Sequence, residues 1–303
     1  MACERKFYGA VEAGGTKFVC AIGDELGNIH VEERRPTTDP DSTLAAVRAF
    51  LQDGAREFGR PAAIGIGSFG PVELDRTSAR YGHIGRTPKS GWSNTNIVGV
   101  LAQEFSCPMG IDTDVNAAAL AERRWGCAQG VANLVYLTIG TGIGGGAIAN
   151  GAPIHGLMHP EIGHIYPRRH PLDEGFQGIC PFHGDCLEGL ASGPAILART
   201  GGSLQELDPA HAQWGIEADY LGQLCAQLVL TVAPTRIIIG GGVMSQQRLF
   251  PSIRQRLRHW LGGYIDRPEI LTDTDRYIVP SSLGTQVGIL GALALAIDAT
   301  SPR

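Results

Sequence analysis

Glycine is concentrated at a few points of this chain, and those points limit how it can fold. The 303 residues include 42 glycines, about twice the usual share of roughly 7%. They cluster directly after β-type runs, as in "EAGGTK" (12–17), "TIGTGIGGG" (138–146) and "GGG" (240–242). Glycine at the end of a strand allows the backbone to approach a ligand closely. The pattern predicts strands whose ends form ligand-facing turns.

Strand and helix patterns alternate along the chain, which predicts an α/β protein. Strands are expected in three stretches within 7–34, and at 62–70, 109–114, 132–151 and 236–244. Helices are expected at 41–59, 96–105, 115–126, 189–200, 217–233 and 283–297. Two similar β-turn-β openings, at 7–23 and 132–149, predict two domains of related design. We expect a small N-terminal lobe (1–115), with helix 284–299 packing back on it, and a large lobe (116–283).

The composition restricts the classes of partner and the compartment. Hydrophobic residues make up 43% of the chain, charged residues 18%, and the net charge is -5. This balance gives no general attraction to nucleic acid or to an anionic membrane. The start "MACERKFYGA" has no apolar core of a secretory signal, and no apolar run approaches the roughly 20 residues of a membrane span. Seven scattered cysteines do not suggest a disulfide framework, so we expect a cytoplasmic protein.

The glycine-rich turns are candidates for binding phosphate. Their backbone N–H groups can point at an anion, threonine hydroxyls add donors, and Lys17 adds positive charge. Neither β-turn-β stretch matches a P-loop or a dinucleotide fingerprint, and each alone reads as an ordinary hairpin. Three such turns together favour nucleotide binding. The candidate ATP-binding residues are Gly14, Gly15, Thr16, Lys17, Thr138, Gly140, Thr141, Gly142, Gly241 and Gly242.

The stretch "GICPFHGDCLEG" (178–189) holds Cys180, His183 and Cys186 at tight spacing. Two thiols and an imidazole within seven residues suit a tetrahedral soft-ligand ion, above all zinc. The alternative is a pair of free buried cysteines beside surface histidines. Without a pattern to place them, the other histidines of this region, at 155, 159 and 170, are interpreted as surface or loop residues.

Asp114 lies where an apolar strand meets the start of a helix. An aspartate at such a position commonly caps the helix, because its carboxylate accepts hydrogen bonds from the first free N–H groups. From these residues alone, capping is the default interpretation of Asp114.

These motifs, taken in order, resemble the ROK family of sugar kinases within the actin-like ATPase (ribonuclease H-like) fold. The resemblance rests on "EAGGTKFVCAIG", "GIGSFGP", "TPKSGW", "DTDVNAAALAE", "LTIGTGIGGGAI", "HPEIGH", "CPFHGDCLEGLASGPAI" and "IIIGGGV". "TPKSGW" and "CPFHGDC" are most similar to bacterial fructokinases. Glu12 stands where many members have aspartate, and Thr113 where many have asparagine before the base. Repressor members carry a helix-turn-helix before the kinase region, for which we expect no room here.

The resemblance implies two lobes with an active-site cleft between them, ATP with Mg²⁺, and a homodimer. It supplies His164 as a fourth zinc ligand, and four protein ligands make the zinc structural, so that it stabilises the loop. Glu161 and Glu188, which could instead be solvated loop charges, are implied to bind sugar together with His164. The resemblance also makes Asp114 the general base. The further candidate sugar contacts are Gly67, Ser68, Thr87 and Thr113.

The function expected is ATP-dependent phosphorylation of a hexose, above all of fructose to fructose 6-phosphate. The alternatives within the family are glucokinase, mannokinase and N-acetylhexosamine kinase. Two other classes are a sugar-sensing protein without catalysis and a zinc-stabilised structural module without a nucleotide site.

Overall fold

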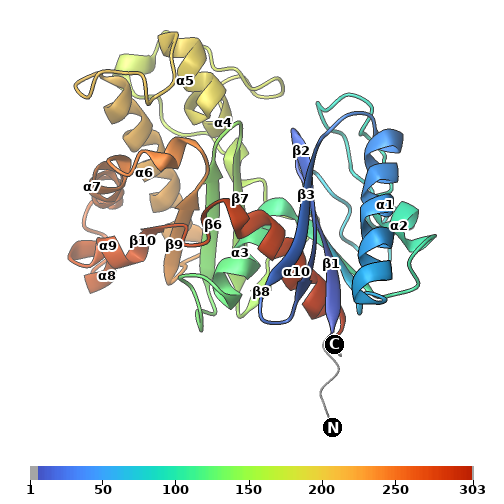
Figure 1. Ribbon diagram of the computed structural model, residues 1–303. Helices are drawn as coiled ribbons and strands as arrows, with labels where there is room; N and C mark the ends of the chain where they lie inside the picture. The colour runs from blue at the N-terminus through green and yellow to red at the C-terminus, as the bar shows by residue number, and fades with distance from the viewer. Residues whose placement is uncertain (1–5, 302–303) are drawn as a thin grey trace. The chain divides into compact units, whose positions relative to one another are not determined.

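A computed structural model describes residues 6–301 of the chain, which divides into two compact units (Figure 1). Unit 1 consists of the chain up to Gln129, the short segment His155–His159, and the chain from Leu283 onward. Unit 2 consists of Gly130–Ile154 and Pro160–Ser282. The chain therefore passes from one unit to the other four times, at 129/130, 154/155, 159/160 and 282/283.

Unit 1 is built on a five-stranded sheet of order β3-β2-β1-β4-β5. The β1–β2 and β2–β3 pairs are antiparallel, whereas β1–β4 and β4–β5 are parallel. Its strands are β1 (Phe7–Ala13), β2 (Lys17–Asp24), β3 (Ile29–Pro36), β4 (Ile64–Ser68) and β5 (Met109–Thr113). Its helices are α1 (Pro40–Phe58), α2 (Ile97–Ala102), α3 (Asp114–Arg124) and α10 (Val287–Ala299), the last preceded by the 3₁₀ turn η4 (Gly284–Gln286).

The two faces of this sheet bury alternate residues of the same strands, because successive side chains of a strand point to opposite sides. Val11 of β1 and Phe18 of β2 belong to a core completed by α1 and α2. Ala10 and Val19 belong to a second core completed by α10. Figure 1 shows α10 running beside β1. The C-terminal helix is thus a structural element of unit 1, although it is the last helix of the chain.

Unit 2 contains the second five-stranded sheet, of order β10-β9-β6-β7-β8. Its strands are β6 (Leu134–Ile139), β7 (Ile143–Ala149), β8 (Ala152–Pro153), β9 (Arg236–Gly240) and β10 (Ile278–Pro280). Its helices are α4 (Leu187–Ala191), α5 (Gly193–Thr200), α6 (Gln213–Thr231), α7 (Leu249–Leu261), α8 (Pro268–Leu271) and α9 (Thr274–Tyr277). Three 3₁₀ turns complete the unit: η1 (Ile162–His164), η2 (Pro171–Asp173) and η3 (Val243–Ser245). Helices α6 and α7 pack on each other within one apolar core.

Most of the elements expected from the sequence are present, and two differences have local causes. The helix expected over 189–200 is two helices, because Ser192 is extended (φ -72°, ψ 160°) and caps α5 through the N–H of Ala195. Helix α7 is not among the elements predicted from the sequence. Its apolar residues Leu249, Ile253 and Leu257 recur at helical spacing and are buried, so that the signal was present in the sequence.

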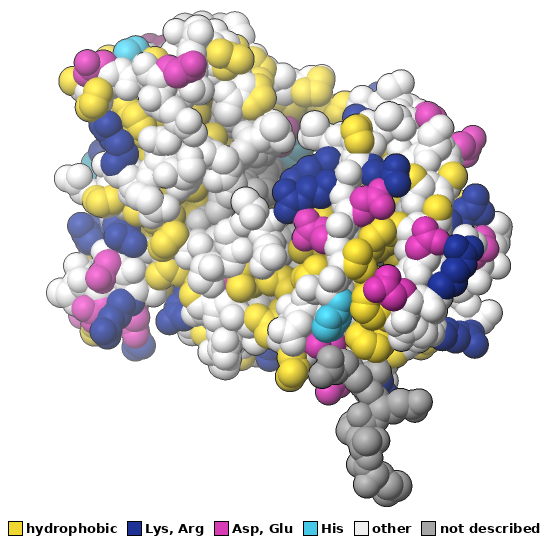
Figure 2. Space-filling model, in the orientation of Figure 1, with side chains coloured by type: hydrophobic (Ala, Val, Ile, Leu, Met, Phe, Trp, Pro, Cys, Tyr) yellow, Lys and Arg dark blue, Asp and Glu magenta, His cyan; other side chains and the backbone are white. Residues whose placement is uncertain are grey.

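The surface carries mixed charge on the face that Figure 2 presents, where acidic and basic side chains alternate. In the described part of the chain, no helix combines the length and the apolar character that crossing a membrane requires.

The packing of α10 against β4 depends on Gly65. A Cβ atom at this position would lie 1.9 Å from the carbonyl oxygen of Ala292 and 2.4 Å from the backbone nitrogen of Ala296. Both atoms belong to the backbone of α10, which cannot move aside as the end of a side chain can. Gly65→Ala is therefore expected to lower the free energy of unfolding by about 3 kcal/mol, the upper part of the range for overpacking.

Urea unfolding of the wild type and of two variants measures this cost. Gly215 is the matched control, because it is an exposed helix residue with no atom within 4 Å of the position of its Cβ. Gly215→Ala should leave stability unchanged or raise it by up to about 1 kcal/mol. Equal stabilities of the two variants would contradict the close approach of α10.

Candidate functional site

Four possible metal ligands converge in unit 2. His164, Cys180, His183 and Cys186 place one ligand atom each, and all four atoms lie within 4.8 Å of one another. The Nδ1 atom of His164 is 3.4 Å from Sγ of Cys186 and 3.8 Å from Sγ of Cys180. The Nδ1 atom of His183 is 3.7 Å from Sγ of Cys180. Bonds of 2.0–2.3 Å to a tetrahedral ion imply ligand separations of roughly 3.3–3.8 Å. The group therefore fits a four-coordinate ion with sulfur and nitrogen ligands.

The backbone holds these ligands through a tight loop. Cys180 and Gly184 exchange two backbone hydrogen bonds, of 3.1 and 2.9 Å. Cys186 is buried and stands at the N-cap of α4, whereas His164 ends η1. Burial raises the pKa of the Cys186 thiol to about 12 in the absence of a cation, with the Cys180 thiol and Glu188 adding to the effect. A metal ion would supply the positive charge that a buried thiolate requires.

The segment that carries Glu161 and His164 lies directly on strand β7. A Cβ atom at Gly163 would lie only 1.8 Å from the carbonyl oxygen of Ile143, so that no other residue fits there. Glu188, on α4, reaches the same strand and accepts a hydrogen bond from the N–H of Ile143 (3.0 Å). The metal ligands, the two glutamates and the β6–β7 turn are thereby joined within one unit.

The two carboxylates influence each other. Burial raises the pKa of Glu161, and the negative charge of Glu188 raises it further. Glu161 as a residue is exposed, so that water limits the size of this effect. A pair of carboxylates beside a glycine-rich turn can accept several hydrogen bonds from the hydroxyls of a polyol.

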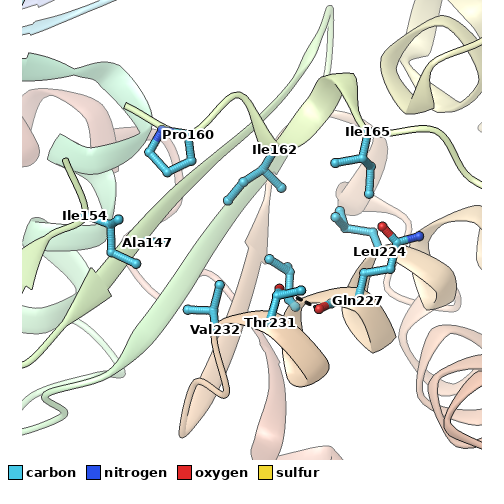
Figure 3. A pocket seen from close by; sticks show the side chains of 10 residues that line it. Ala147, Ile154, Pro160, Ile162, Ile165, Leu224, Gln227, Thr231 and Val232 are labelled. Carbon is cyan, nitrogen blue, oxygen red and sulfur yellow. Dashed lines mark hydrogen bonds between the residues drawn. The ribbon is translucent and has the colours of Figure 1, made fainter. Parts of the chain in front are cut away.

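An apolar pocket of about 290 Å³ lies against this segment (Figure 3). Ile162 and Ile165 line it together with residues of α6, and Gln227 and Thr231 are its polar side chains. Sugar binding needs several donors and acceptors that converge on hydroxyls. The apolar pocket offers few, and neither Glu161 nor His164 is among the residues that line it.

The backbone that follows β6 contacts the backbone at the start of α5 and at the end of β9. Gly140 accepts a hydrogen bond from the N–H of Gly193 (2.8 Å) and donates one to Gly142 (2.9 Å). Gly241 has φ +94°, and a Cβ atom there would lie 2.4 Å from the carbonyl oxygen of Ile139. The predicted nucleotide residues of unit 2 therefore lie together, with Gly241, Gly242 and the side chain of Thr141 exposed.

The first glycine turn, in unit 1, joins β1 to β2. The N–H of Gly14 donates to the carbonyl of Lys17 (3.0 Å), and Thr37 holds the turn through the carbonyl of Gly14 (2.7 Å). Gly15, Thr16 and Lys17 are exposed. Glu12 lies near the end of β1, before this turn. Burial raises the pKa of its carboxyl group, and the positive charge of Lys17 offsets part of that rise.

Asp114 begins α3, but it is not the capping residue. Thr113 is the N-cap, and its hydroxyl accepts the N–H of Asn116 (3.1 Å). Asp114 accepts the N–H of Val115 through one oxygen (2.9 Å). The capping role considered from the sequence thus falls to Thr113, and the carboxylate of Asp114 is not required for it.

The other candidate contacts of unit 1 lie at the end of strand β4 and in the loop that contains Thr87. Ser68 is fully buried, and its hydroxyl donates to the carbonyl of Phe69 (2.9 Å). Gly67 pairs with Glu12 and Asp112 on the neighbouring strands. Thr87 accepts the N–H of Lys89 (3.3 Å) and is half-buried.

The histidines at 155 and 159 are interpreted from the sequence as surface or loop residues; both lie in a loop, but His159 is not at the surface. His159 is 3% exposed, and its Nε2 atom accepts the N–H of Val72 (3.1 Å). His155 is partly exposed but contacts the buried Asp112 at 3.0 Å. No spacing rule links these partners, because they lie more than 40 residues apart in the chain.

Comparison with known proteins assigns the chain to a protein family. A sequence profile described as "ROK family" matches residues 8–299, and the chain belongs to this family. Its fold is the two-lobed actin-like ATPase fold of ROK sugar kinases.

Named relatives and a solved structure refine the comparison. The chain is 48% identical to a "Putative fructokinase" of Bacillus subtilis, over 96% of this chain and 95% of the relative. It is 44% identical to the "Fructokinase" of Zymomonas mobilis, over 99% of both chains. A ROK family glucokinase from Streptomyces griseus, solved in complex with glucose and AMPPNP, superposes with a TM-score of 0.75 at 26% identity, over 97% of this chain and 99% of that one.

The raised pKa of Glu161 makes a prediction about stability. The folded protein binds a proton at this group more tightly than the unfolded chain does, so that ionisation lowers stability as pH rises from about 4 toward neutrality. Glu161→Gln removes the charge. It is expected to raise the free energy of unfolding at pH 7 by less than about 1 kcal/mol, because water screens part of the side chain.

Urea unfolding at several pH values measures the effect as a difference between variant and wild type. Glu57→Gln, at an exposed position on α1, is the control and should show no such pH-dependent difference. A Glu161→Gln protein that is less stable than the wild type at pH 7 would contradict the prediction.

Proposed function

We propose that this protein is an ATP-dependent hexokinase-type phosphotransferase that converts fructose to fructose 6-phosphate. The observation that carries the proposal is the convergence of Glu161, Glu188 and His164 beside the β6–β7 glycine turn of unit 2. The substrate is inferred from relatives named fructokinase that are 41–48% identical over most of the chain.

We propose Asp114 as the general base. Its carboxylate lies where β5 meets α3; one oxygen accepts the N–H of Val115, and the N-cap of the helix is Thr113. In phosphoryl transfer, such a carboxylate orients the attacking hydroxyl and accepts its proton. Little covalent chemistry is required of the protein in this reaction, so that positioning of the two substrates dominates.

We propose that sugar hydroxyls are bound by the following residues: Glu161, His164, Glu188, Gly67, Ser68, Thr87 and Thr113. Since the hydroxyl of Ser68 already donates to Phe69, Ser68 and Gly67 are proposed to contribute backbone groups. The charged acceptors Glu161 and Glu188 are expected to provide the strongest of the hydrogen bonds.

We propose that ATP is bound by the glycine turns, through the following residues: Gly14, Gly15, Thr16, Lys17, Thr138, Gly140, Thr141, Gly142, Gly241 and Gly242. Backbone N–H groups and threonine hydroxyls can surround phosphate oxygens without the bulk of side chains. Mg²⁺ bound with the nucleotide neutralises charge on the phosphates. Gly241 and Gly242 allow close approach of the adenosine part.

A hexose panel with ATP and Mg²⁺ tests the function. Fructose is expected to give the highest kcat/KM, and NMR of the product should place the phosphate on carbon 6. Asp114→Ala is expected to bind fructose with unchanged affinity in calorimetry while kcat falls by about 10²–10⁴. Asp53→Ala, an exposed aspartate on α1, is the control and should match the wild type.

Three results would overturn parts of this proposal. A preference for glucose, mannose or an N-acetylhexosamine would assign one of the other activities found in sugar kinases. Turnover of Asp114→Ala close to that of the wild type would remove Asp114 as the base. Failure to phosphorylate any hexose would remove the enzymatic function.

We propose zinc as the ion of the four-ligand group, because two thiols and two imidazoles are the soft and borderline ligands that zinc prefers. Four protein ligands leave no open position for water, so that the ion would be structural. Metal analysis of freshly purified protein is expected to find one zinc per chain. Cys186→Ser should lose the zinc and have a lower Tm and a higher KM for the sugar.

Cys107→Ser is the matched control, since Cys107 is a half-buried thiol of unit 1 outside the ligand group. It should keep one zinc per chain. A wild-type protein without zinc, or a Cys186→Ser variant with unchanged KM, would contradict the proposed role of the ion.

A further inference from the structure

The segment His155–His159 belongs to unit 1, although unit 2 residues precede and follow it in the chain. Its middle is exposed: Leu157 and Met158 make up the tip of the loop. Its two ends are histidines, and each is hydrogen-bonded to a different element of unit 1. Exposed residues between two anchored ends indicate that the histidines hold this segment in place.

His155 holds the end of strand β5 through Asp112. The Nε2 atom of His155 lies 3.0 Å from Oδ2 of Asp112, whose side chain is 4% exposed. The other oxygen of Asp112 accepts the N–H of Thr113 (2.8 Å) and the side-chain amide of Asn116 (2.7 Å). A carboxylate only accepts hydrogen bonds, so Nε2 of His155 must carry a proton. Asp112 therefore links His155 to the first turn of α3, where Asp114 begins the helix.

His159 holds the loop that follows strand β4. The N–H of Val72 donates to Nε2 of His159 at 3.1 Å, in a fully buried contact. This nitrogen must therefore be unprotonated, and the neutral ring carries its proton on Nδ1. Val72 also bridges to Ile84 on the return of the same loop. The loop begins at Ser68, the last residue of β4.

The two contacts end on Asp112, two residues before Asp114, and on Val72, four residues after the end of β4 at Ser68. Two residues after His159, the same chain carries Glu161. A segment of five residues is therefore bonded to residues close in the chain to the proposed base and to the proposed sugar contacts Gly67 and Ser68. Because phosphoryl transfer depends on placing the attacking hydroxyl correctly, an error of about 1 Å in these elements can cost on the order of 100-fold in rate.

We propose that His155 and His159 are positioning residues for the transfer reaction: His155 sets the position of Asp114 through Asp112, and His159 sets the sugar-contacting loop through Val72. The inference rests on the proposed hexose kinase activity and adds two residues to its machinery. The two roles are separable. Loss of the first contact affects the base and so kcat, whereas loss of the second affects ground-state binding of the sugar and so KM.

Leucine and glutamine substitutions test the two roles. Leucine removes the polar atom in either position. Glutamine places an amide where Nε2 of histidine lies, so that its N–H₂ can donate to Asp112 and its oxygen can accept from Val72. His155→Leu is expected to lower kcat for the hexose about tenfold, and His159→Leu to raise KM for the hexose about tenfold. Both glutamine variants should stay within about threefold of the wild type, and KM for ATP should not change.

His259→Leu is the matched control, because His259 is exposed on α7 in unit 2; it should match the wild type. If His159→Leu does not fold, His159→Asn replaces it, since its shorter side chain cannot reach Val72 but tolerates burial near polar groups. Leucine variants with wild-type kinetics, glutamine variants as impaired as leucine variants, or an equal rise of KM for ATP would overturn the proposal. A wild-type protein inactive on every hexose would instead overturn the proposed function.

Discussion

The buried carboxylate of Asp173 anchors the irregular segment on which the metal-ligand group depends. Its side chain is 1% exposed and forms an ion pair with Arg199 of α5 (2.7 Å). The hydroxyl of Tyr220 on α6 donates to the second oxygen at 2.7 Å. A buried guanidinium requires such a partner, since removing one member of a buried pair leaves an uncompensated charge. The stretch between η1 and α4 has little apolar core of its own, and this ion pair fixes its middle.

The same segment is held at its start by Gln223 of α6. The side-chain amide of Gln223 accepts the N–H of Arg168 (2.8 Å) and donates to the carbonyl of the same residue (2.9 Å). These two bonds satisfy both backbone polar groups of Arg168, as a neighbouring strand would in a sheet. With its start and middle fixed to α5 and α6, the segment brings Cys180 and His183 to Cys186 at the N-terminus of α4. The metal-ligand group thus fixes the end of a segment whose start and middle are already held by α5 and α6.

The sequence reveals those parts of the site whose residues are close in the chain or carry distinctive chemistry. Cys180, His183 and Cys186 lie within seven residues, and soft ligands at that spacing have few other uses. The glycine turns are visible because glycine interrupts strand patterns. The Asp112–His155 and Val72–His159 contacts are invisible, because each joins residues that only the fold brings together. Histidine is common in loops, and nothing in its neighbours distinguishes an exposed ring from His159, which is 3% exposed.

The charge of the proposed zinc group explains why the glutamates beside it matter. Two thiolates cancel the charge of a divalent cation, and neutral imidazoles add none. Such a group would fix the backbone without attracting or repelling a ligand. The local electrostatics would then be set by Glu161 and Glu188: burial raises the pKa of Glu161, and the negative charge of Glu188 raises it further. In the proposed function, sugar hydroxyls that donate to both carboxylates would relieve the repulsion between them, because a charged acceptor gains most from each hydrogen bond. The repulsion between two carboxylates that lie beside an uncharged metal group would in this way contribute to the affinity for a polyol.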